Sequence, residues 1–185
     1  MNLNPIYRFL RYFKGLLYYF SSVPNWLYKV RTIRKYGKGI NIFIETGTCY
    51  GETLWNVRND FMKLYSVELS PELAAFSRER LMGAAQIEIG ESVPFLEKLL
   101  PSIHEPVIFW LDAHYSGGST ARGVEDTPII KELQTITKYW VDGSVILIDD
   151  ANLFGTDHNY PSILEVQTLV PNLNLSVEKG IIRMK

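Results

Sequence analysis

The sequence contains one cysteine, Cys49, among its 185 residues. A lone cysteine cannot form an internal disulfide, which fits a reducing compartment, so a cytoplasmic location is expected. Internal repeats, low-complexity segments and long linkers are also missing. With 46% hydrophobic and 21% charged residues, the composition is that of a globular domain with a full core.

Acidic residues are missing from the first 38 positions, although the chain has 20 of them. Eight of the 19 lysines and arginines lie there, namely Arg8, Arg11, Lys14, Lys29, Arg31, Arg34, Lys35 and Lys38. The two parts of the chain therefore carry opposite net charge. We expect a basic amphipathic helical arm at 1–38 and a separate domain at 39–185.

Residues 1–20 lack an apolar run of the about 20 residues that a membrane-spanning helix needs, because three cations interrupt it. The apolar residues recur at helical spacing, which predicts an amphipathic helix. No small-residue cleavage site follows, so a signal peptide is not expected. Pro24 ends this helix, and residues 26–36 predict a second basic, aromatic helix.

The arm has three alternative roles. It packs on the domain as a lid or homodimer element, or it lies peripherally on the anionic inner face of a membrane, as basic helices rich in aromatic residues do. Nucleic acid binding is not expected, since no recognised nucleic-acid motif accompanies the basic residues and the main domain is acidic.

From residue 39, short apolar runs alternate with amphipathic segments. The pattern predicts strands at 40–46, 63–68, 86–90, 107–112 and 144–149, and helices at 52–60, 71–82, 92–100, 126–139 and 161–169. Two more short strands are expected at 173–177 and 180–184. The predicted fold class is α/β, a Rossmann-like doubly wound sheet of about seven mostly parallel strands with helices on both faces, plus the N-terminal helical arm.

A glycine turn follows the first predicted strand. Glu45 ends the strand, and Gly47 and Gly51 lie in the turn before the next helix. Such a turn holds nucleotide-like ligands, because glycine lets the backbone approach them closely. The spacing differs from the dinucleotide fingerprint, and no lysine follows Gly51 as in a phosphate loop. Glu68, at the end of the second strand, suits the two ribose hydroxyls of such a ligand, unless it is only a surface charge at a helix start.

Acidic residues also follow the fourth and fifth predicted strands. Asp112 ends the fourth strand, with His114 two positions later on the same side, and Asp149 and Asp150 end the fifth. If these strands are neighbours, the side chains converge where open α/β sheets bind ligands. Clustered carboxylates need a neutralising cation, and oxygen ligands select Mg²⁺, or Mn²⁺ or Ca²⁺. The alternative is that these aspartates only cap turns and bind backbone amides.

His114 has three alternative roles, as general base, metal ligand or structural loop residue. An ordinary histidine pKa near 6.5 suits the removal of a proton from a hydroxyl group. The polar loop 115–125 that follows is a candidate substrate lid, with Tyr115 and Arg122 as contacts. Residues 154–160 are candidates for a similar role.

These motifs together resemble the class I S-adenosylmethionine (SAM) methyltransferases. The segments at 45–48, 67–73, 111–118, 126–133 and 146–151 resemble a set of bacterial methyltransferase-like proteins of unassigned substrate. The paired acids resemble the metal-dependent O-methyltransferases of the catechol and macrocin types. The catechol type usually has asparagine in place of Asp150, and the macrocin type has an acid in place of His114. The resemblance covers roughly residues 39–185.

The resemblance implies SAM as cofactor and assigns roles to particular residues. The implied cofactor-binding residues are Glu45, Gly47, Thr48, Gly51, Glu68, Glu91, Ser92 and Asp112. Glu91 and Ser92 match the adenine position after the third strand, where the alternative is an exposed loop acid. Asp112, Asp149 and Asp150 would bind the divalent ion, and His114 and Asp112 would be catalytic.

The expected function is SAM-dependent O-methylation of a small-molecule or sugar hydroxyl, helped by the ion. One alternative is a noncatalytic SAM-fold regulatory or scaffold module that the basic arm tethers to a membrane or a larger complex. A third alternative is a nucleotide-sugar enzyme that uses the acids as a metal site. It is disfavoured because the glycine turn lacks a phosphate-binding spacing.

Overall fold

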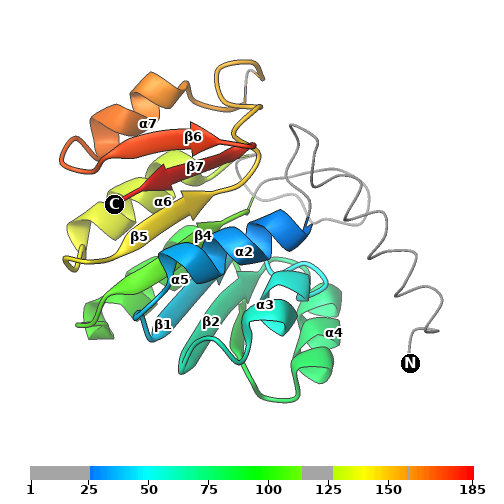
Figure 1. Ribbon diagram of the computed structural model, residues 1–185. Helices are drawn as coiled ribbons and strands as arrows, with labels where there is room; N and C mark the ends of the chain where they lie inside the picture. The colour runs from blue at the N-terminus through cyan, green and yellow to red at the C-terminus, as the bar shows by residue number, and fades with distance from the viewer. Residues whose placement is uncertain (1–25, 114–126, 158) are drawn as a thin grey trace.

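The computed structural model describes residues 26–113, 127–157 and 159–185, which form a seven-stranded sheet with helices on both faces (Figure 1). The strands are β1 (Ile42–Thr46), β2 (Lys63–Glu68), β3 (Gln86–Ile89), β4 (Val107–Leu111), β5 (Val145–Ile148), β6 (Leu175–Glu178) and β7 (Ile181–Met184). The helices are α2 (Trp26–Tyr36), α3 (Glu52–Val57), α4 (Pro71–Leu81), α5 (Ser92–Leu99), α6 (Ile129–Lys138) and α7 (Ile163–Leu169), with a 3-10 turn at Leu100–Ser102. The predicted α/β class is confirmed.

The strand order is β3-β2-β1-β4-β5-β7-β6. Strands β1 to β5 run parallel, whereas β7 is antiparallel to both of its neighbours. Because β1 pairs with β2 on one side and with β4 on the other, the order reverses there, which is where open α/β sheets bind ligands. The sequence left open whether the fourth and fifth predicted strands are neighbours, and the structure pairs them in parallel.

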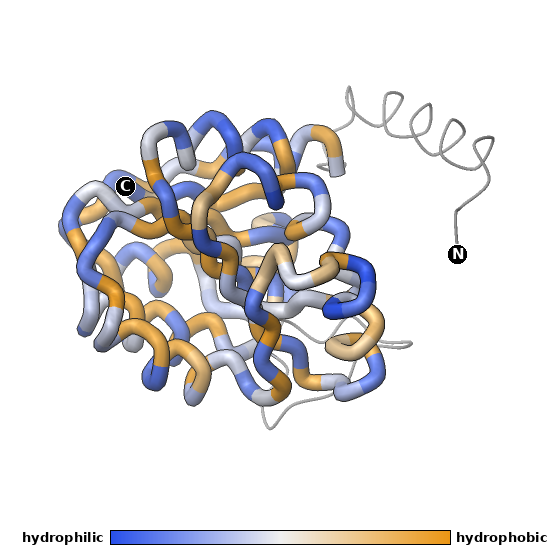
Figure 2. Tube along the Cα trace, turned by 90° about the horizontal axis from the view of Figure 1, so that it is seen from below, coloured by the Kyte–Doolittle hydropathy of each residue, from blue (hydrophilic) through white to orange (hydrophobic). Residues whose placement is uncertain are grey.

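Two hydrophobic layers hold the helices on the sheet. Side chains of successive strand residues point to opposite faces, so Phe43 joins the layer under α2, α3 and α4, while Ile42 and Ile44 join the layer under α5, α6 and α7. Figure 2 shows hydrophobic residues running along the strands through the middle of the molecule, with hydrophilic residues recurring at the outer helices and turns. This burial supplies the main driving force for folding.

Helix starts follow local capping chemistry. Ser70 accepts a hydrogen bond from the Leu73 amide at 3.3 Å, and Pro71 occupies the first turn of α4, so this helix begins at residue 71, where it was predicted to begin. The start of α6 differs from its prediction at 126, since the helix begins at Ile129. Pro128 takes the N-cap position there, because its ψ of 3° is not helical.

The second predicted helix of the arm is confirmed as α2, and it packs on the domain. Val30 and Ile33 are buried against α3 and the sheet, and α2 lies across the near face of the sheet in Figure 1. Residues 1–25 lie outside the described residues, so the division of the chain at residue 38 stays a prediction. Within the described part of the chain, no helix is long and apolar enough to cross a membrane.

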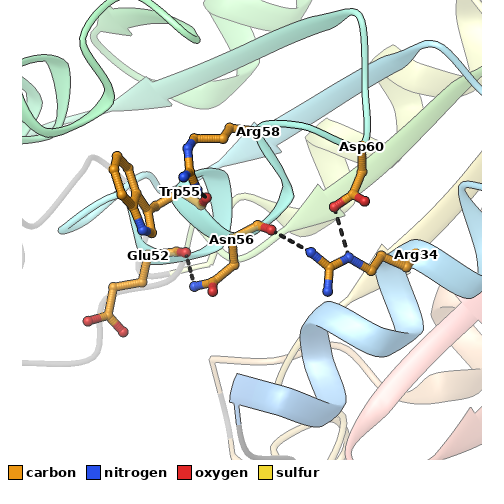
Figure 3. A network of polar contacts seen from close by, with 6 residues as sticks. All are labelled: Arg34, Glu52, Trp55, Asn56, Arg58 and Asp60. Atoms are coloured by element: carbon orange, nitrogen blue, oxygen red, sulfur yellow. Dashed lines mark hydrogen bonds and ion pairs between the residues drawn. The ribbon is translucent and has the colours of Figure 1, made fainter. Parts of the chain in front are cut away.

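Polar contacts hold both ends of α2. Arg34 donates to the Asp60 carboxylate and to the Asn56 carbonyl, both at 2.8 Å, and Asn56 in turn donates to the Glu52 carbonyl at 2.7 Å (Figure 3). Near the other end, the Tyr28 hydroxyl accepts a hydrogen bond of 2.6 Å from Arg183 of β7. These contacts fix α2 relative to α3 and to the sheet.

Candidate active site

The glycine turn after β1 is shaped by its contact with β4. Gly47 has φ +83°, and a Cβ atom there would lie 2.8 Å from the Asp112 carbonyl carbon and closer still to its oxygen. Gly51 has φ +66° and lies against Ser77 of α4. Both glycines are therefore required by the protein's own packing, which holds the turn close to the end of β4.

A cavity of about 260 Å³ lies between α2, this turn and the start of α3. Gly47 and Thr48 line it from the turn, Asp112 from the end of β4, and Trp26 and Lys29 from α2. The structure thus brings three of the predicted cofactor residues to one cavity. Two residues that the sequence did not mark, Trp26 and Lys29, complete its wall.

Glu45 is buried beneath the turn, with a side chain 2% exposed, and it is not among the residues that line the cavity. Its carboxyl accepts a hydrogen bond of 2.9 Å from the Ser66 hydroxyl, which also contacts the Thr48 hydroxyl at 2.6 Å. Burial raises the pKa of Glu45 well above its ordinary value, and nearby Asp112 adds to the effect. Direct contact of Glu45 with the cofactor stays a prediction.

Glu68 links the turn to the start of α4. Its carboxylate accepts hydrogen bonds from the amides of Cys49 at 2.7 Å and Ser70 at 2.9 Å. Each carboxylate oxygen has two lone pairs, so ribose hydroxyls can bind alongside these amides. The predicted ribose contact therefore fits the position of Glu68, and it stays a prediction.

Glu91 and Ser92 lie beside the end of β2, since the Gly90 amide donates to the Glu68 carbonyl at 3.0 Å. Glu91 is exposed at the N-cap of α5, whereas Ser92 is 5% exposed. Their predicted role at the adenine stays a prediction. The position of Glu91 and Ser92 agrees with this role, because they follow β3, and β3 pairs with β2, which ends in Glu68.

The predicted acidic residues meet at the ends of β4 and β5. Asp112 and Asp149 directly follow the two strands, and the Asp149 amide donates to the Leu111 carbonyl at 3.1 Å. Asp149 is 2% exposed, and one of its oxygens accepts a 2.9 Å hydrogen bond from the Asp150 amide. Asp150 has φ +52°, a left-handed conformation that turns the chain sharply after β5.

A lysine from α2 supplies positive charge to these acids. The ammonium of Lys29 forms an ion pair with the other oxygen of Asp149. Burial lowers the pKa of Lys29, but Asp149, Asp112 and Asp150 together raise it above its ordinary value. Burial raises the pKa of Asp149, and the Lys29 ammonium opposes that shift. We call Lys29, Asp112, Asp149 and Asp150 the acid rim.

The structure resembles several solved structures of methyltransferases. Over 98% of the chain and 93% of the other protein, the structure resembles a Staphylococcus aureus protein that carries a provisional assignment as a caffeoyl-CoA O-methyltransferase, at TM-score 0.64 and 15% identity. It also resembles an O-methyltransferase of Bacillus cereus in complex with S-adenosylhomocysteine (SAH), at 0.58 and 15%, covering 84% and 77% of the two chains. An O-methyltransferase of Streptomyces achromogenes involved in tomaymycin synthesis, in complex with SAM, matches at 0.57 and 17%, covering 84% and 76%.

The chain has the fold of the SAM-dependent methyltransferases. No family model matches the sequence, and no curated protein matches it. At these identities the likeness concerns the fold, so the roles of individual residues must come from the geometry of the site itself.

A divalent ion does not fit the acid rim in this geometry. Both carboxylate oxygens of Asp149 already have partners, one of them the Lys29 ammonium. Among residues 26–113, 127–157 and 159–185, no three histidine, cysteine or acidic side chains form a group that could hold a metal ion. The predicted metal role of Asp112, Asp149 and Asp150 thus receives no support from the described side chains.

Several predicted site residues lie outside the described residues, namely His114, Tyr115, Arg122 and His158. The catalytic role of His114 and the lid role of the loop 115–125 stay predictions. In the second candidate lid, Phe154 is 6% exposed and packs edge to face on Tyr160 at 5.2 Å. These two rings form a packed wall beside Asp112 and Asp149 around a small cavity of about 20 Å³.

Lys29 is the main residue that sequence reasoning missed. It was counted with the basic residues of the arm, because its charge matched theirs. One signal could have marked it: Lys29 lies four positions before Ile33, on the same stripe of the helix that carries the buried apolar side chains. A charged residue on a buried stripe needs a partner, and the acid rim provides it.

Proposed function

We propose that the chain is a SAM-dependent methyltransferase that methylates a hydroxyl oxygen of a small molecule or sugar. The observation that carries the proposal is the cavity of about 260 Å³ between the glycine turn and Asp112, in a chain with the methyltransferase fold. The structural neighbours with bound SAM and SAH support this choice of cofactor.

The residues around the cavity suit the two ends of the cofactor. Gly47 and Thr48 present backbone and a small side chain to the methionine part, and Glu68 lies at the strand end that suits a ribose. Glu91 and Ser92 would meet the adenine. Trp26 covers the cavity from α2 and helps to keep water out. When bound, SAM supplies an electrophilic methyl group to the acceptor.

The acid rim would position the acceptor. Asp112 lines the cavity and can accept a hydrogen bond from a hydroxyl group, while Lys29 beside it favours negative charge that develops on the acceptor oxygen. His114, two residues after Asp112, is proposed to remove the hydroxyl proton. A divalent ion is part of the original expectation, but the described residues do not fit one, so no step depends on it.

The basic arm has fewer free cations than its sequence suggests. Lys29 and Arg34 are engaged with Asp149 and Asp60, so they do not contribute to a membrane-facing surface. The peripheral contact with an anionic membrane, and the alternative homodimer contact, therefore fall to the remaining basic residues of 1–38. A cytoplasmic enzyme that acts on small acceptors fits either contact.

Calorimetric titration of the purified full chain with SAH tests the proposal. We expect a saturable site with micromolar affinity, a binding free energy of about 8 kcal/mol. The Glu97→Gln variant, at an exposed position of α5 that does not line the cavity, should bind equally well. A folded protein that shows no SAH binding would overturn the proposal and favour the noncatalytic module. A positive result leads to a screen of catechol-like and sugar hydroxyl acceptors.

A further inference from the structure

The acid rim contains a cation built into the fold. Lys29 pairs with Asp149, and its ammonium is also close enough to Asp112 and Asp150 for their charges to act on it. The pair is largely enclosed, since the Asp149 side chain is 1% exposed and that of Lys29 is 26% exposed. Lys29 thus stands among the three acids that the sequence assigned to a divalent ion.

The placement of Lys29 is fixed by the rest of α2. Val30 and Ile33 are buried under the helix, while Arg34 holds α2 to Asp60 and Tyr28 holds it to Arg183. The lysine side chain therefore reaches the rim from a backbone with little freedom to move. A flexible surface lysine could move away from its partner with little loss of free energy. If Lys29 moved away, the buried Asp149 carboxylate would lose its cation, which is costly.

An ammonium and a divalent ion would compete for the same carboxylate oxygens. Lys29 engages one oxygen of Asp149, and the Asp150 amide engages the other. Each oxygen keeps a second lone pair, so these partners alone do not exclude an ion, but a divalent ion beside the Lys29 ammonium would be repelled by its charge.

We propose that the Lys29 ammonium is the resident cation of the acid rim and takes the place that a divalent ion would have there. The wild-type chain then has no saturable Mg²⁺ or Mn²⁺ site at the rim. Removal of the ammonium leaves one oxygen of the enclosed Asp149 without its cation, close to the negative charges of Asp112 and Asp150, and a divalent ion then takes the vacated place. The readout is ion binding, so this proposal and methyl transfer can fail independently.

The proposal is tested by titrating the full chain with Mn²⁺. Electron paramagnetic resonance measures the free ion, and binding is calculated from the loss of its signal. The wild type should show no saturable site, and Lys29→Met, which keeps the length and apolar character of the side chain, should bind Mn²⁺ at least ~tenfold more tightly. Lys35→Met is the matched control, because it makes the same substitution at an exposed lysine of α2. The double variant Lys29→Met with Asp149→Asn should lose the gain.

Each outcome decides the proposal. A saturable Mn²⁺ site in the wild type that Asp149→Asn removes would overturn it. A folded Lys29→Met variant without Mn²⁺ binding would also overturn it, because the ammonium would then not occupy an ion-binding position. If Lys29→Met does not fold, Lys29→Gln replaces it, since the amide still donates a hydrogen bond to Asp149. Recovery of folding by Mn²⁺ in either variant, and not in the double variant, supports the proposal.

Discussion

The two sides of the candidate site are held together over different distances along the chain. On the cofactor side, Glu68 binds the amides of Cys49 and Ser70, which lie 19 and 2 residues away. On the acid side, Asp149 binds Lys29, which lies 120 residues away. The contacts of Glu68 thus lie within one β1-α3-β2 unit and the start of α4, although α2 and Asp112 complete the cavity wall. The Asp149–Lys29 pair forms only after α2 packs across the sheet.

This difference indicates which contacts of the site contribute most to the free energy of unfolding. On the cofactor side, Glu68 accepts two hydrogen bonds from backbone amides, each with a modest net contribution. The acid side concentrates its charge in one enclosed ion pair, and breaking such a pair costs more than forming it contributes. Substitutions on the two sides should therefore differ in both size and kind.

The largest effect is expected at the acid rim. Lys29→Met leaves the 1% exposed Asp149 side chain without its cation, so the free energy of unfolding should fall by about 3–5 kcal/mol at pH 7. Urea denaturation followed by far-ultraviolet circular dichroism measures it. Addition of Mn²⁺ should restore part of the loss in the variant, because an ion that binds only the folded state stabilises it.

Arg34→Ala gives the comparison within the same helix. Arg34 and Asp60 are 51% and 32% exposed, so loss of their ion pair should cost less than about 1 kcal/mol. Equal losses for Arg34→Ala and Lys29→Met would show that α2 as a whole, and not the enclosed pair, carries the stability.

The next largest effect is expected in the glycine turn. Gly47→Ala places a Cβ against the Asp112 carbonyl at φ +83°, so overlap adds to backbone strain and the cost should be about 2–4 kcal/mol. Gly39→Ala is the matched control, since Gly39 has φ +85° with no atom near its missing Cβ. That variant should cost about 1–2 kcal/mol, from the conformation alone. Similar losses in the two variants would contradict the close approach of the turn to β4.

A smaller effect is expected on cofactor affinity. Glu68→Gln removes a charged acceptor, and SAH should bind ~10-fold to 100-fold more weakly, as for a lost charge-assisted hydrogen bond. Glu97→Gln, on the exposed side of α5, should bind SAH normally. Both are measured by calorimetric titration.

The 2′-deoxyribose analogue of SAH separates a ribose contact from a distorted turn. The wild type should prefer SAH to the analogue, whereas Glu68→Gln should lose most of this preference. An unchanged preference in the variant would mean that Glu68 acts only by holding the Cys49 and Ser70 amides.

The sequence was informative wherever neighbours along the chain determine the structure. Apolar periodicity predicted β2 at its observed bounds, and the helix predicted from residue 71 begins at Pro71, where Ser70 caps it. Each of these features depends on propensity, periodicity or capping within a short stretch, which is what a sequence displays directly.

The sequence was less informative about which charges meet. Nothing in the order of residues connects Lys29 with Asp149, since their contact depends on how α2 crosses the sheet. The position of the Glu45 side chain also depends on contacts between elements, which the order of residues does not display. The strand end is expected to present this acid to the ligand. In the structure, pairing of β1 with β2 sets Glu45 opposite Ser66, and the Ser66 hydroxyl donates a hydrogen bond to the buried Glu45 carboxyl.

The last prediction concerns this buried acid and has the smallest expected effect. Because burial raises the pKa of Glu45, the folded chain keeps a proton that the unfolded chain releases at lower pH. Below the ordinary carboxyl pKa both states are protonated, and the stability from this site is fully present. As pH rises toward the folded-state pKa, the free energy of unfolding falls, since the unfolded state then binds fewer protons than the folded one.

Glu45→Gln removes this titration while its amide oxygen still accepts from Ser66. The variant should match the wild type near pH 4 and become progressively more stable than it at pH 6 and pH 8, as measured by urea denaturation at each pH. Glu79→Gln on the exposed side of α4 should show no such trend. A gain that is equal at every pH would mean that folding does not shift the pKa of Glu45, so that its carboxyl is ionised in the folded chain at pH 6 and pH 8. The cofactor side would then also hold a buried charge, and the contrast with the acid rim would disappear.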